Sequence, residues 1–369
     1  MILLALRNLV AEKTRFAFSA AGIGFAVFLI TVLLGLYQGW NEKVGGFVED
    51  VDADAWIVRE GTTDFINAAS ILPRSLGEDV ADRNDVAGVY PLVVRPMQFF
   101  EGDKKVEIHL IGYDVESGIG GPVKIVKGRG DPGDGEIIVD DVLSRTLNVA
   151  IGDTLTSGDS SFEVIGIASG GNFAFTQAGF MSVEAAANLL DMGDLVTFWL
   201  VDLEEGASTD TLASEVTAGA DGVAVYSSGE FASATRHRIL DNVIPIIIVI
   251  LGLALIVGIA ITSLTIYTAT VERTREFGIM KAIGFNNGDL YRLVMLQSFI
   301  TGGVGFVFGV ALTLIASQFV DRIAAQFILY VRPFDVLLVL IATVVMAAIS
   351  SIVPARRVGA VDPAVAFKG

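Results

Sequence analysis

Four long stretches of the chain contain no charged residue and consist mainly of apolar side chains. They cover residues 16–37, 243–266, 293–320 and 336–353. An α-helix rises about 1.5 Å per residue, so about 20 residues cross a hydrocarbon core of roughly 30 Å. All four stretches are close to or above that length, the last one only just. The pattern therefore predicts four transmembrane helices.

The segment between the first two stretches has a different pattern. Runs that alternate in polarity or are rich in β-branched residues, as is typical of strands, lie at residues 54–59, 106–112 and 162–167. Glycine-rich turn sequences occupy residues 128–135 and 156–161. Helical patterns follow at 182–190, after the N-cap residue Ser182, and at 209–218. We expect an α+β domain of about 200 residues, large enough for a core of its own.

Basic residues in the short connecting segments set the orientation, because cytoplasmic loops carry an excess of Lys and Arg. The residues concerned are Arg7, Lys13, Arg15, Arg273, Arg275, Lys281, Arg292, Arg356, Arg357 and Lys368. They lie before the first stretch, between the second and third, and after the fourth. We therefore expect both chain termini in the cytoplasm and residues 41–241 outside it.

Together these patterns predict a membrane protein with four transmembrane α-helices in a 1 + 3 arrangement. A large α+β extracytoplasmic domain is inserted between helices 1 and 2. The predicted segments are a cytoplasmic N-terminal segment at 1–15, helix 1 at 16–40, the outer domain at 41–241, helix 2 at 242–268, a cytoplasmic loop at 269–292, helix 3 at 293–320, an outer loop at 321–334, helix 4 at 335–353 and a cytoplasmic tail at 354–369.

Composition supports this interpretation and shows where the charge lies. Apolar residues make up 53% of the chain and the mean hydropathy is +0.63, yet the net charge is −17. Residues 41–241 hold 35 Asp and Glu against 13 Lys and Arg, a net charge of −22. Such a domain is not expected to bind nucleic acid or an anionic membrane surface. Its acidic run at 49–54 is interpreted as a solvated face, with cation binding as the alternative.

Several kinds of chemistry are disfavoured by what the chain lacks. It has no cysteine, which excludes disulfides, thiolate metal sites and a cysteine nucleophile. Its two histidines, His109 and His237, are far apart in sequence, and His109 is expected to be an ordinary half-exposed strand residue. No G-x-x-x-x-G-K-[ST] phosphate loop occurs, so the chain is not expected to bind and hydrolyse ATP or to be an enzyme by itself.

The segment between the second and third stretches combines mixed charges with turn residues. Residues 272–283 continue the helical pattern, and Gly284 can end a helix in a left-handed conformation. Residues 286–288 form a turn sequence, and a new helix is expected to start around Asp289. The result is a hairpin beyond the bilayer, suited to receiving force from a cytoplasmic partner. A plain connecting loop is the alternative.

This loop resembles that of the MacB/FtsX-like family of ABC transporter permeases, whose usual form is E-R-x-x-E-(F/I)-G-(I/V)-x-(K/R)-A-(I/L)-G. The matching residues are Glu272, Arg273, Glu276, Phe277, Gly278, Ile279, Lys281, Ala282, Ile283 and Gly284. The tail at 353–367 is similar to the family's closing motif. Residues 5–15 resemble the amphipathic helix before its first span, which places such a helix in segment 1–15. Residues 137–167 are like part of its periplasmic core domain, so the likeness covers nearly the whole chain.

The resemblance implies that the loop docks on an ATPase, through a coupling helix that begins near Asn286. The implied ATPase-coupling residues are Glu272, Arg273, Glu276, Gly278, Lys281, Gly284, Asn286 and Asp289. Two permeases would work with two separate ATPase subunits, which makes a homodimer the expected form. The ATPase subunits would bind ATP and Mg, and the chain itself would need no cofactor or metal. The family tends to work by mechanotransmission, in which the long second helix carries motion from the loop to the outer domain.

The resemblance leaves the substrate open. The size of the chain is like that of compact permeases that export haem or other lipophilic compounds, and of those that serve glycolipid export. A candidate substrate site lies at the outer ends of the first two spans and comprises Tyr37, Trp40, Glu42, Arg236, His237 and Arg238. Aromatic rings can stack on a flat apolar ligand, and arginines can pair with carboxylates or phosphates. Alternatively, the aromatic residues are interfacial anchors and the arginines contact lipid headgroups.

Three functions fit these observations. The leading one is the permease subunit of an exporter for a lipophilic or amphipathic compound. The second is a force-transmitting complex of the same family that regulates an extracytoplasmic partner, such as a cell-wall hydrolase. The third is a membrane-anchored ligand sensor. A neighbouring gene for an ATPase, a hydrolase or a kinase would distinguish among them.

Overall fold

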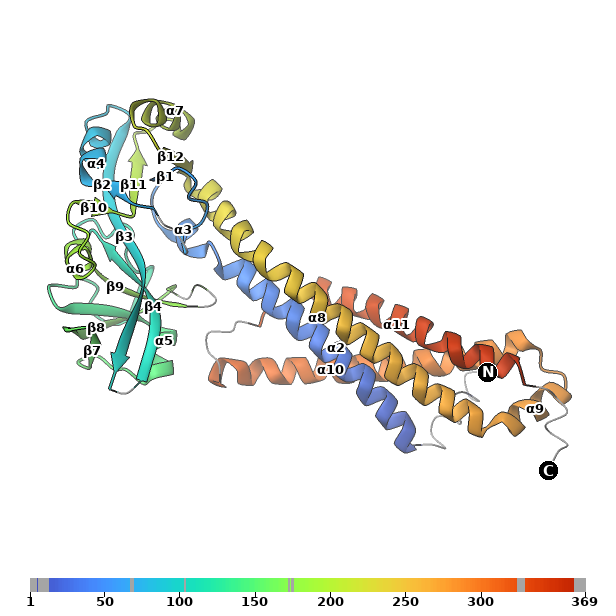
Figure 1. Ribbon diagram of the computed structural model, residues 1–369. Coiled ribbons are helices and arrows are strands. Elements are labelled where there is room, and N and C mark those ends of the chain that lie inside the picture. The colour runs from blue at the N-terminus through green and yellow to red at the C-terminus, as the bar shows by residue number, and fades with distance from the viewer. Residues whose placement is uncertain are drawn as a thin grey trace. The chain divides into compact units, whose positions relative to one another are not determined.

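The computed structural model describes residue 5 and residues 13–66, 70–102, 104–171, 173, 176–323 and 329–361. Backbone contacts divide the chain into two compact units, whose elements are labelled in Figure 1. The helical unit comprises Met1–Gln38, Ile244–Val320 and Leu329–Gly369, and the sheet unit comprises Gly39–Val243 and Asp321–Ile328. Most of the predicted amphipathic helix at 1–15, and the tail beyond residue 361, lie outside the described residues.

Four helices in the described part of the chain are long and apolar enough to cross a membrane. They are α2 (Lys13–Lys43), α8 (Ser228–Glu272), α10 (Asn287–Ile323) and α11 (Pro333–Gly359). Each contains one predicted span and extends beyond it, because helical hydrogen bonding continues into the flanking polar residues. A sheet-rich domain lies between α2 and α8 in the chain, which confirms the predicted 1 + 3 fold class.

Close backbone approach holds α2 against α10 in the helical unit. A Cβ atom added at Gly309 would lie 2.5 Å from the carbonyl oxygen of Gly24. One added at Gly305 would lie 2.7 Å from the Ile23 side chain. Small residues permit such contacts in lipid, where helix association depends on packing. Ile23 and Val27 are fully buried at this contact as a result.

The sheet unit is built on one mixed sheet of ten strands in the order β12-β1-β11-β3-β4-β9-β6-β8-β5, with β7 pairing with β3 and β8. Its strands are β1 (Ala55–Arg59), β3 (Val86–Glu101), β4 (Lys104–Tyr113), β5 (Lys124–Gly128), β6 (Glu136–Asp140), β7 (Thr154–Ser157), β8 (Ser160–Ser169), β9 (Gln177–Ser182), β11 (Phe198–Leu203) and β12 (Val223–Ser227). A separate small sheet pairs β2 (Leu72–Pro73) with β10 (Leu195–Val196).

Alternation along the strands gives this sheet two apolar faces. On one face, residues such as Ile57 and Leu110 pack against α4 (Arg74–Ala81), α5 (Asp141–Leu147), α6 (Val183–Leu189) and α7 (Thr209–Gly219). On the other face, Trp56 and Phe198 pack against Phe231 of α8 and the short helix α3 (Gly46–Asp50). The predicted strands near 54, 106 and 162 and the helices after Ser182 and at 209 are all present.

His109 differs from the expectation of a half-exposed strand residue. It is only 4% exposed, because the loops that precede β2 and β9 cover it. Its Nε2 atom lies 2.9 Å from the carbonyl oxygen of Ile66, and its Nδ1 atom lies 2.7 Å from the hydroxyl of Thr176. Its ring also packs edge-on against Phe173. Burial lowers the pKa of His109, so the neutral ring acts as a bridge between two loops.

Asp140 links the start of α5 to the loop after β8. Its Oδ1 atom accepts a hydrogen bond from the Val142 N–H at 2.9 Å, and its Oδ2 atom accepts one from the Gly171 N–H at 3.0 Å. The residue is 0% exposed. Burial raises the pKa of Asp140 to about 6, although both N–H donors oppose the shift.

We predict that Asp140 makes the sheet unit less stable as the pH rises from about 4 to about 6. The folded state holds the proton more tightly than the unfolded state, so the contribution of this group is largest below its unfolded pKa. A shift from 3.8 to about 6 corresponds to about 3 kcal/mol. Urea unfolding at pH 4 and pH 7, followed by tryptophan fluorescence of the full chain, should show wild type losing more stability than Asp140→Asn by roughly that amount. Parallel losses in both proteins would contradict the assignment.

Candidate functional site

The segment between α8 and α10 forms a compact hairpin, here called the α9–α10 hairpin (Glu272–Asp289). Helix α8 ends at Glu272, and α9 (Thr274–Ala282) starts after a break at Arg273. The expected helical extension is therefore interrupted once. The break directs Phe277 into a buried cluster with Leu290 and Leu293.

Gly284 ends α9 in the expected left-handed conformation, with φ +106. The Phe285 N–H donates to the Met280 carbonyl at 3.0 Å, and the Gly284 N–H donates to the Lys281 carbonyl at 3.0 Å. These two bonds form a Schellman motif, which satisfies carbonyls that the helix end would leave unpaired. A residue with a Cβ atom is strained at this φ, so glycine is required here.

Asn286 and Asp289 fix the start of α10 by capping each other. The Asp289 N–H donates to Oδ1 of Asn286 at 2.9 Å, and the Asn286 N–H donates to Oδ2 of Asp289 at 3.2 Å. This reciprocal pattern is a capping box, which satisfies two free donors of a helix N-terminus. The helix accordingly begins at Asn287, two residues before the expected position at Asp289.

Lys281 faces the interior of the helical unit. Its Nζ atom donates to the carbonyl oxygens of Gly359 at 2.7 Å and Val361 at 2.8 Å. These carbonyls lie at the C-terminal end of α11, where a cation satisfies free acceptors and the helix dipole. Gly278 is also buried. Both residues hold the hairpin against the rest of the unit.

The outward face of α9 is partly apolar. Ile283 is 71% exposed and Ile279 is 46% exposed, beside the exposed carboxylate of Glu276. Contiguous exposed apolar surface is typical of sites that bind other proteins or a membrane. From the sequence, the two isoleucines were expected only as matches to the family motif. Their helical spacing from the buried Phe277 is the signal that could have placed them outward.

Arg15 connects the start of α2 with the end of α8. Its guanidinium donates two hydrogen bonds to the Glu272 carboxylate, of which the Nη2 to Oε1 bond is 2.6 Å. Both side chains are partly exposed, so the pair adds little stability. It does fix the register of two helix ends far apart in sequence. Arg15 was expected only to report orientation, so this pairing was not foreseen.

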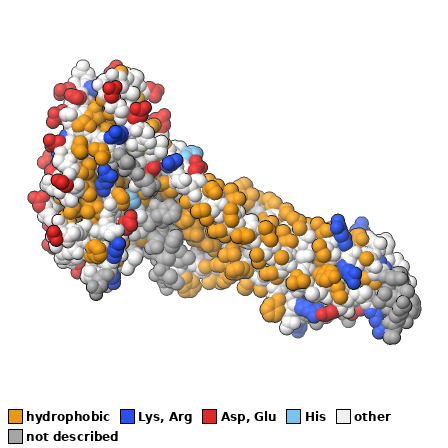
Figure 2. Space-filling model, in the orientation of Figure 1, with side chains coloured by type: hydrophobic (Ala, Val, Ile, Leu, Met, Phe, Trp, Pro, Cys, Tyr) orange, Lys and Arg blue, Asp and Glu red, His pale blue; other side chains and the backbone are white. Residues whose placement is uncertain are grey.

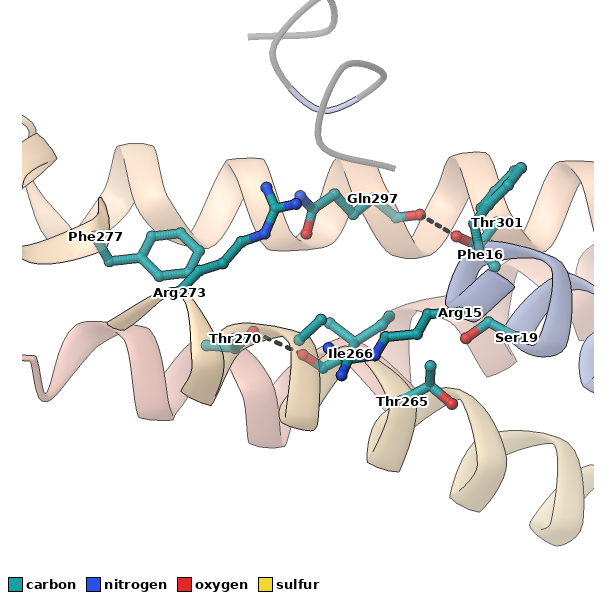
Figure 3. A pocket seen from close by; sticks show the side chains of 11 residues that line it. Arg15, Phe16, Ser19, Thr265, Ile266, Thr270, Arg273, Phe277, Gln297 and Thr301 are labelled. Atoms are coloured by element: carbon teal, nitrogen blue, oxygen red, sulfur yellow. Dashed lines mark hydrogen bonds between the residues drawn. The ribbon is translucent and has the colours of Figure 1, made fainter. Parts of the chain in front are cut away.

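A small cavity lies next to this pair, among α2, α8 and α10 (Figure 3). Its volume is about 50 Å³. It is lined by Arg15, Phe16, Ser19, Thr265, Ile266, Ala269, Thr270, Arg273, Phe277, Gln297 and Thr301. The hydroxyls of Thr270 and Thr301 are each bonded to a carbonyl of their own helix, at 2.7 and 2.8 Å. The cavity shows that the side chains do not fill the space where α8 joins α9. This feature was not expected from the sequence.

The six residues of the candidate substrate site fall into both units. Tyr37 belongs to the helical unit, and Trp40, Glu42, Arg236, His237 and Arg238 belong to the sheet unit. Within the sheet unit, Arg236 donates to the Asn41 carbonyl at 3.0 Å and to the Glu49 carboxylate at 2.9 Å. Trp40 packs with Val44 and Ile239. These contacts give Arg236 and Trp40 structural roles at the end of α2.

His237 and Arg238, which directly follow Arg236 in α8, are exposed. The Nδ1 atom of His237 lies 2.8 Å from the Ser233 carbonyl, so that nitrogen is already engaged within the helix. Among the described residues, no group of three or more His, Asp or Glu residues is arranged to hold a metal ion.

Two protein-family models match the chain. The MacB-like periplasmic core domain model matches residues 16–218, and the FtsX-like permease C-terminal model matches residues 248–363. An uncharacterized ABC transporter permease of Mycobacterium tuberculosis is 25% identical over 375 residues, covering 100% of both chains. The macrolide export ATP-binding/permease protein MacB of Acinetobacter baylyi is 25% identical over 136 residues, which is 37% of this chain and 20% of that protein.

A solved structure is also similar to part of the chain. The periplasmic region of MacB from Actinobacillus actinomycetemcomitans has 14% sequence identity and a TM-score of 0.40. The similarity covers 49% of this chain and 92% of that one.

We predict that Lys281→Met loosens the hairpin without affecting the sheet unit. The substitution removes two charge-assisted hydrogen bonds and should cost about 1–3 kcal/mol. Hydrogen exchange of the full chain should speed up in peptides covering 274–284 and 352–361, with no change in β1 or β4. Arg275→Met, an exposed cation on the same helix, is the control. Equal exchange in Lys281→Met and wild type would show that the two bonds do not hold the hairpin.

Proposed function

The chain belongs to the MacB/FtsX-like family of ABC transporter permeases, and from this premise we propose that it exports a lipophilic or amphipathic compound by mechanotransmission. A separate ATPase subunit would supply the energy and bind ATP and Mg. The observation that carries the proposal is the capped α9–α10 hairpin with its outward isoleucines. A surface that transmits force must be both rigid and able to bind its driver.

In this proposal the family-matched residues divide into two groups. Gly284, Asn286 and Asp289 shape the ends of the two helices, and Gly278 and Lys281 hold α9 in place. Glu276 contributes to the outward face, beside Ile279 and Ile283. Glu272 and Arg273 lie at the joint with α8, where the Arg15 pair restrains movement. The ATPase would therefore contact the isoleucine face, and most of the motif would support that face.

Helix α8 is the proposed transmission element. It has 45 residues, so its length is about 67 Å. Its first turns are anchored in the sheet unit, where the Ser228 hydroxyl donates to the Ala53 carbonyl and the Thr235 hydroxyl accepts from the Phe65 N–H at 3.1 Å. Phe231 is fully buried beside them. A displacement of α8 along its axis would therefore move the sheet unit with it.

The charge distribution supports the proposed orientation, with both termini and the hairpin in the cytoplasm. In Figure 2, Asp and Glu side chains are spread over the sheet unit, and Lys and Arg side chains gather at the α9 end of the helical unit. Cytoplasmic segments carry the excess of basic residues in membrane proteins. We also propose a homodimer that works with two ATPases. Only 17% of the most apolar window of α8 is buried, so a long apolar surface is available to lipid or to a second copy.

The candidate substrate residues that belong to the sheet unit remain part of the proposal. Among them, Trp40 supplies aromatic surface, and the exposed His237 and Arg238 supply polar contacts. Arg236 is held by Asn41 and Glu49, which makes it a supporting residue for such a site.

Ile283→Asp should abolish retention of the ATPase subunit during purification of the co-expressed complex. A charge placed in a buried apolar contact is expected to weaken binding by about 2 kcal/mol or more, which is a loss of at least about 30-fold. Folding should be unaffected because Ile283 is 71% exposed. Ile151→Asp, on an exposed isoleucine of the sheet unit, is the matched control. If the wild type never retains an ATPase, the permease proposal fails. If Ile283→Asp retains it fully, only the assigned contact fails.

Gly284→Val should reduce the stimulation of ATP hydrolysis by the permease about 10-fold. A β-branched residue at φ +106 is strained by about 1–2 kcal/mol, which shifts the hairpin away from its docking shape. The measurement compares ATPase activity of the reconstituted complex with that of the ATPase alone. Ala282→Val, an exposed neighbour with helical backbone, should behave as wild type. Equal stimulation by both variants would refute the role given to Gly284.

A further inference from the structure

The sheet unit contains a groove whose lining contrasts with the acidity of the surrounding surface. The groove lies between β5, β8 and the end of α5, and its volume is about 520 Å³. It is lined by Lys127, Ser144, Arg145, Asn148, Val149, Ala150, Ile151 and Ile167. Two of these eight residues are cationic and none is acidic, in a segment with 35 acidic residues against 13 basic ones. A groove of this size is large enough for several ligand groups.

Three polar side chains of the groove are available for a ligand, whereas the Ser144 hydroxyl donates to the Val149 carbonyl at 2.7 Å. Lys127 forms no ion pair within the described part of the chain, and the side-chain amide of Asn148 forms no hydrogen bond there. Arg145 donates to the Asp141 carboxylate at 2.8 Å, which orients its guanidinium from one side. A guanidinium carries five N–H donors, so Arg145 can also bind a carboxylate that enters the groove.

Apolar contacts accompany these cations. Ile151 is 46% exposed and lies against β5. Its Cδ1 atom would be 2.8 Å from a Cβ atom added at Gly128, the last residue of that strand. Val126 of β5 and Val123, which directly precedes β5, are also exposed apolar residues at this edge of the sheet. The edge strand β5 has five residues and is therefore about 16 Å long, which suits an extended ligand better than a compact one. It is better matched to a short stretch of polypeptide.

We propose that this β5 groove binds an acidic, partly apolar peptide segment of an extracytoplasmic partner protein. Carboxylates of the segment pair with Lys127 and Arg145, and an apolar side chain packs on Ile151. The high negative charge of the rest of the unit repels extended polyanions and acidic membrane surfaces, so only a segment that enters this groove is accepted. The site does not depend on the ATPase or on transport.

The segment is recognised by its side chains rather than as an added strand. Although β5 is the last strand of the sheet, its pairing with β8 shifts register between Ile125 and Lys127. Such a bulge, together with lysines on the edge, disfavours strand addition. Binding should therefore require acidic residues at spaced positions and tolerate changes in backbone conformation.

The test uses the full chain in lipid nanodiscs and a display library of random seven-residue peptides. Recovered peptides should be enriched in Asp and Glu, with at least one large apolar residue. Their affinity should fall about 10-fold or more in the double variant Lys127→Glu, Arg145→Glu and several-fold in Ile151→Gln. It should also weaken as salt rises from about 50 to 300 mM. All three residues are exposed, and unchanged thermal unfolding of each variant verifies folding.

Arg59→Glu is the matched control, because it reverses an exposed charge on β1 at the opposite end of the sheet. It should leave peptide affinity within about 2-fold, since an exposed charge beyond the Debye length is screened. No acidic enrichment, or equal losses in Arg59→Glu and the double variant, would overturn the proposal. Preferential binding of phosphatidylglycerol vesicles over peptides to the full chain in nanodiscs would also overturn it.

Discussion

A bilayer offers no hydrogen-bond partner to a peptide group, and this constraint determines where each kind of structure occurs in the chain. The four apolar segments are helices because a helix satisfies its own backbone. Several polar side chains within them follow the same rule. The hydroxyls of Thr31, Thr313 and Thr343 each donate to the carbonyl four residues earlier, at 2.7, 3.0 and 2.7 Å. The ten-stranded sheet, with its turns and unpaired edges, is confined to the segment between the first two spans.

The same requirement shapes the helix ends, and it is there that the proposed function is concentrated. Each end leaves free backbone groups that must be capped. At the α9–α10 hairpin a glycine turn caps the end of α9, an Asn–Asp capping box caps the start of α10, and the ammonium of Lys281 caps the end of the neighbouring helix α11. These hydrogen bonds fix the conformation of the hairpin. They leave the apolar face formed by Ile279 and Ile283 exposed. Rigidity and exposure together are what a coupling surface needs.

Much of this organisation can be predicted from the sequence because it depends on local chemistry. Absence of charge identifies the spans, Ser182 predicts the start of α6, and glycine at 284 predicts a left-handed helix end. The rest depends on contacts between distant residues. The burial of His109 requires two loops to meet over it, and the Arg15–Glu272 pair joins residues 257 positions apart. Composition alone cannot show that Lys281 faces inward while Ile283 faces outward, since that follows from how α9 packs on α11.

The proposed mechanism requires the sheet unit and the α9–α10 hairpin to lie on opposite sides of the membrane. The chain contains no cysteine, so single cysteines can be introduced cleanly. Thr217→Cys on α7 and Ala282→Cys on α9 both occupy exposed positions. A membrane-impermeant maleimide applied to intact cells should label the first variant at once and the second only after lysis. Equal labelling of both in intact cells would contradict the topology on which the proposed mechanism depends.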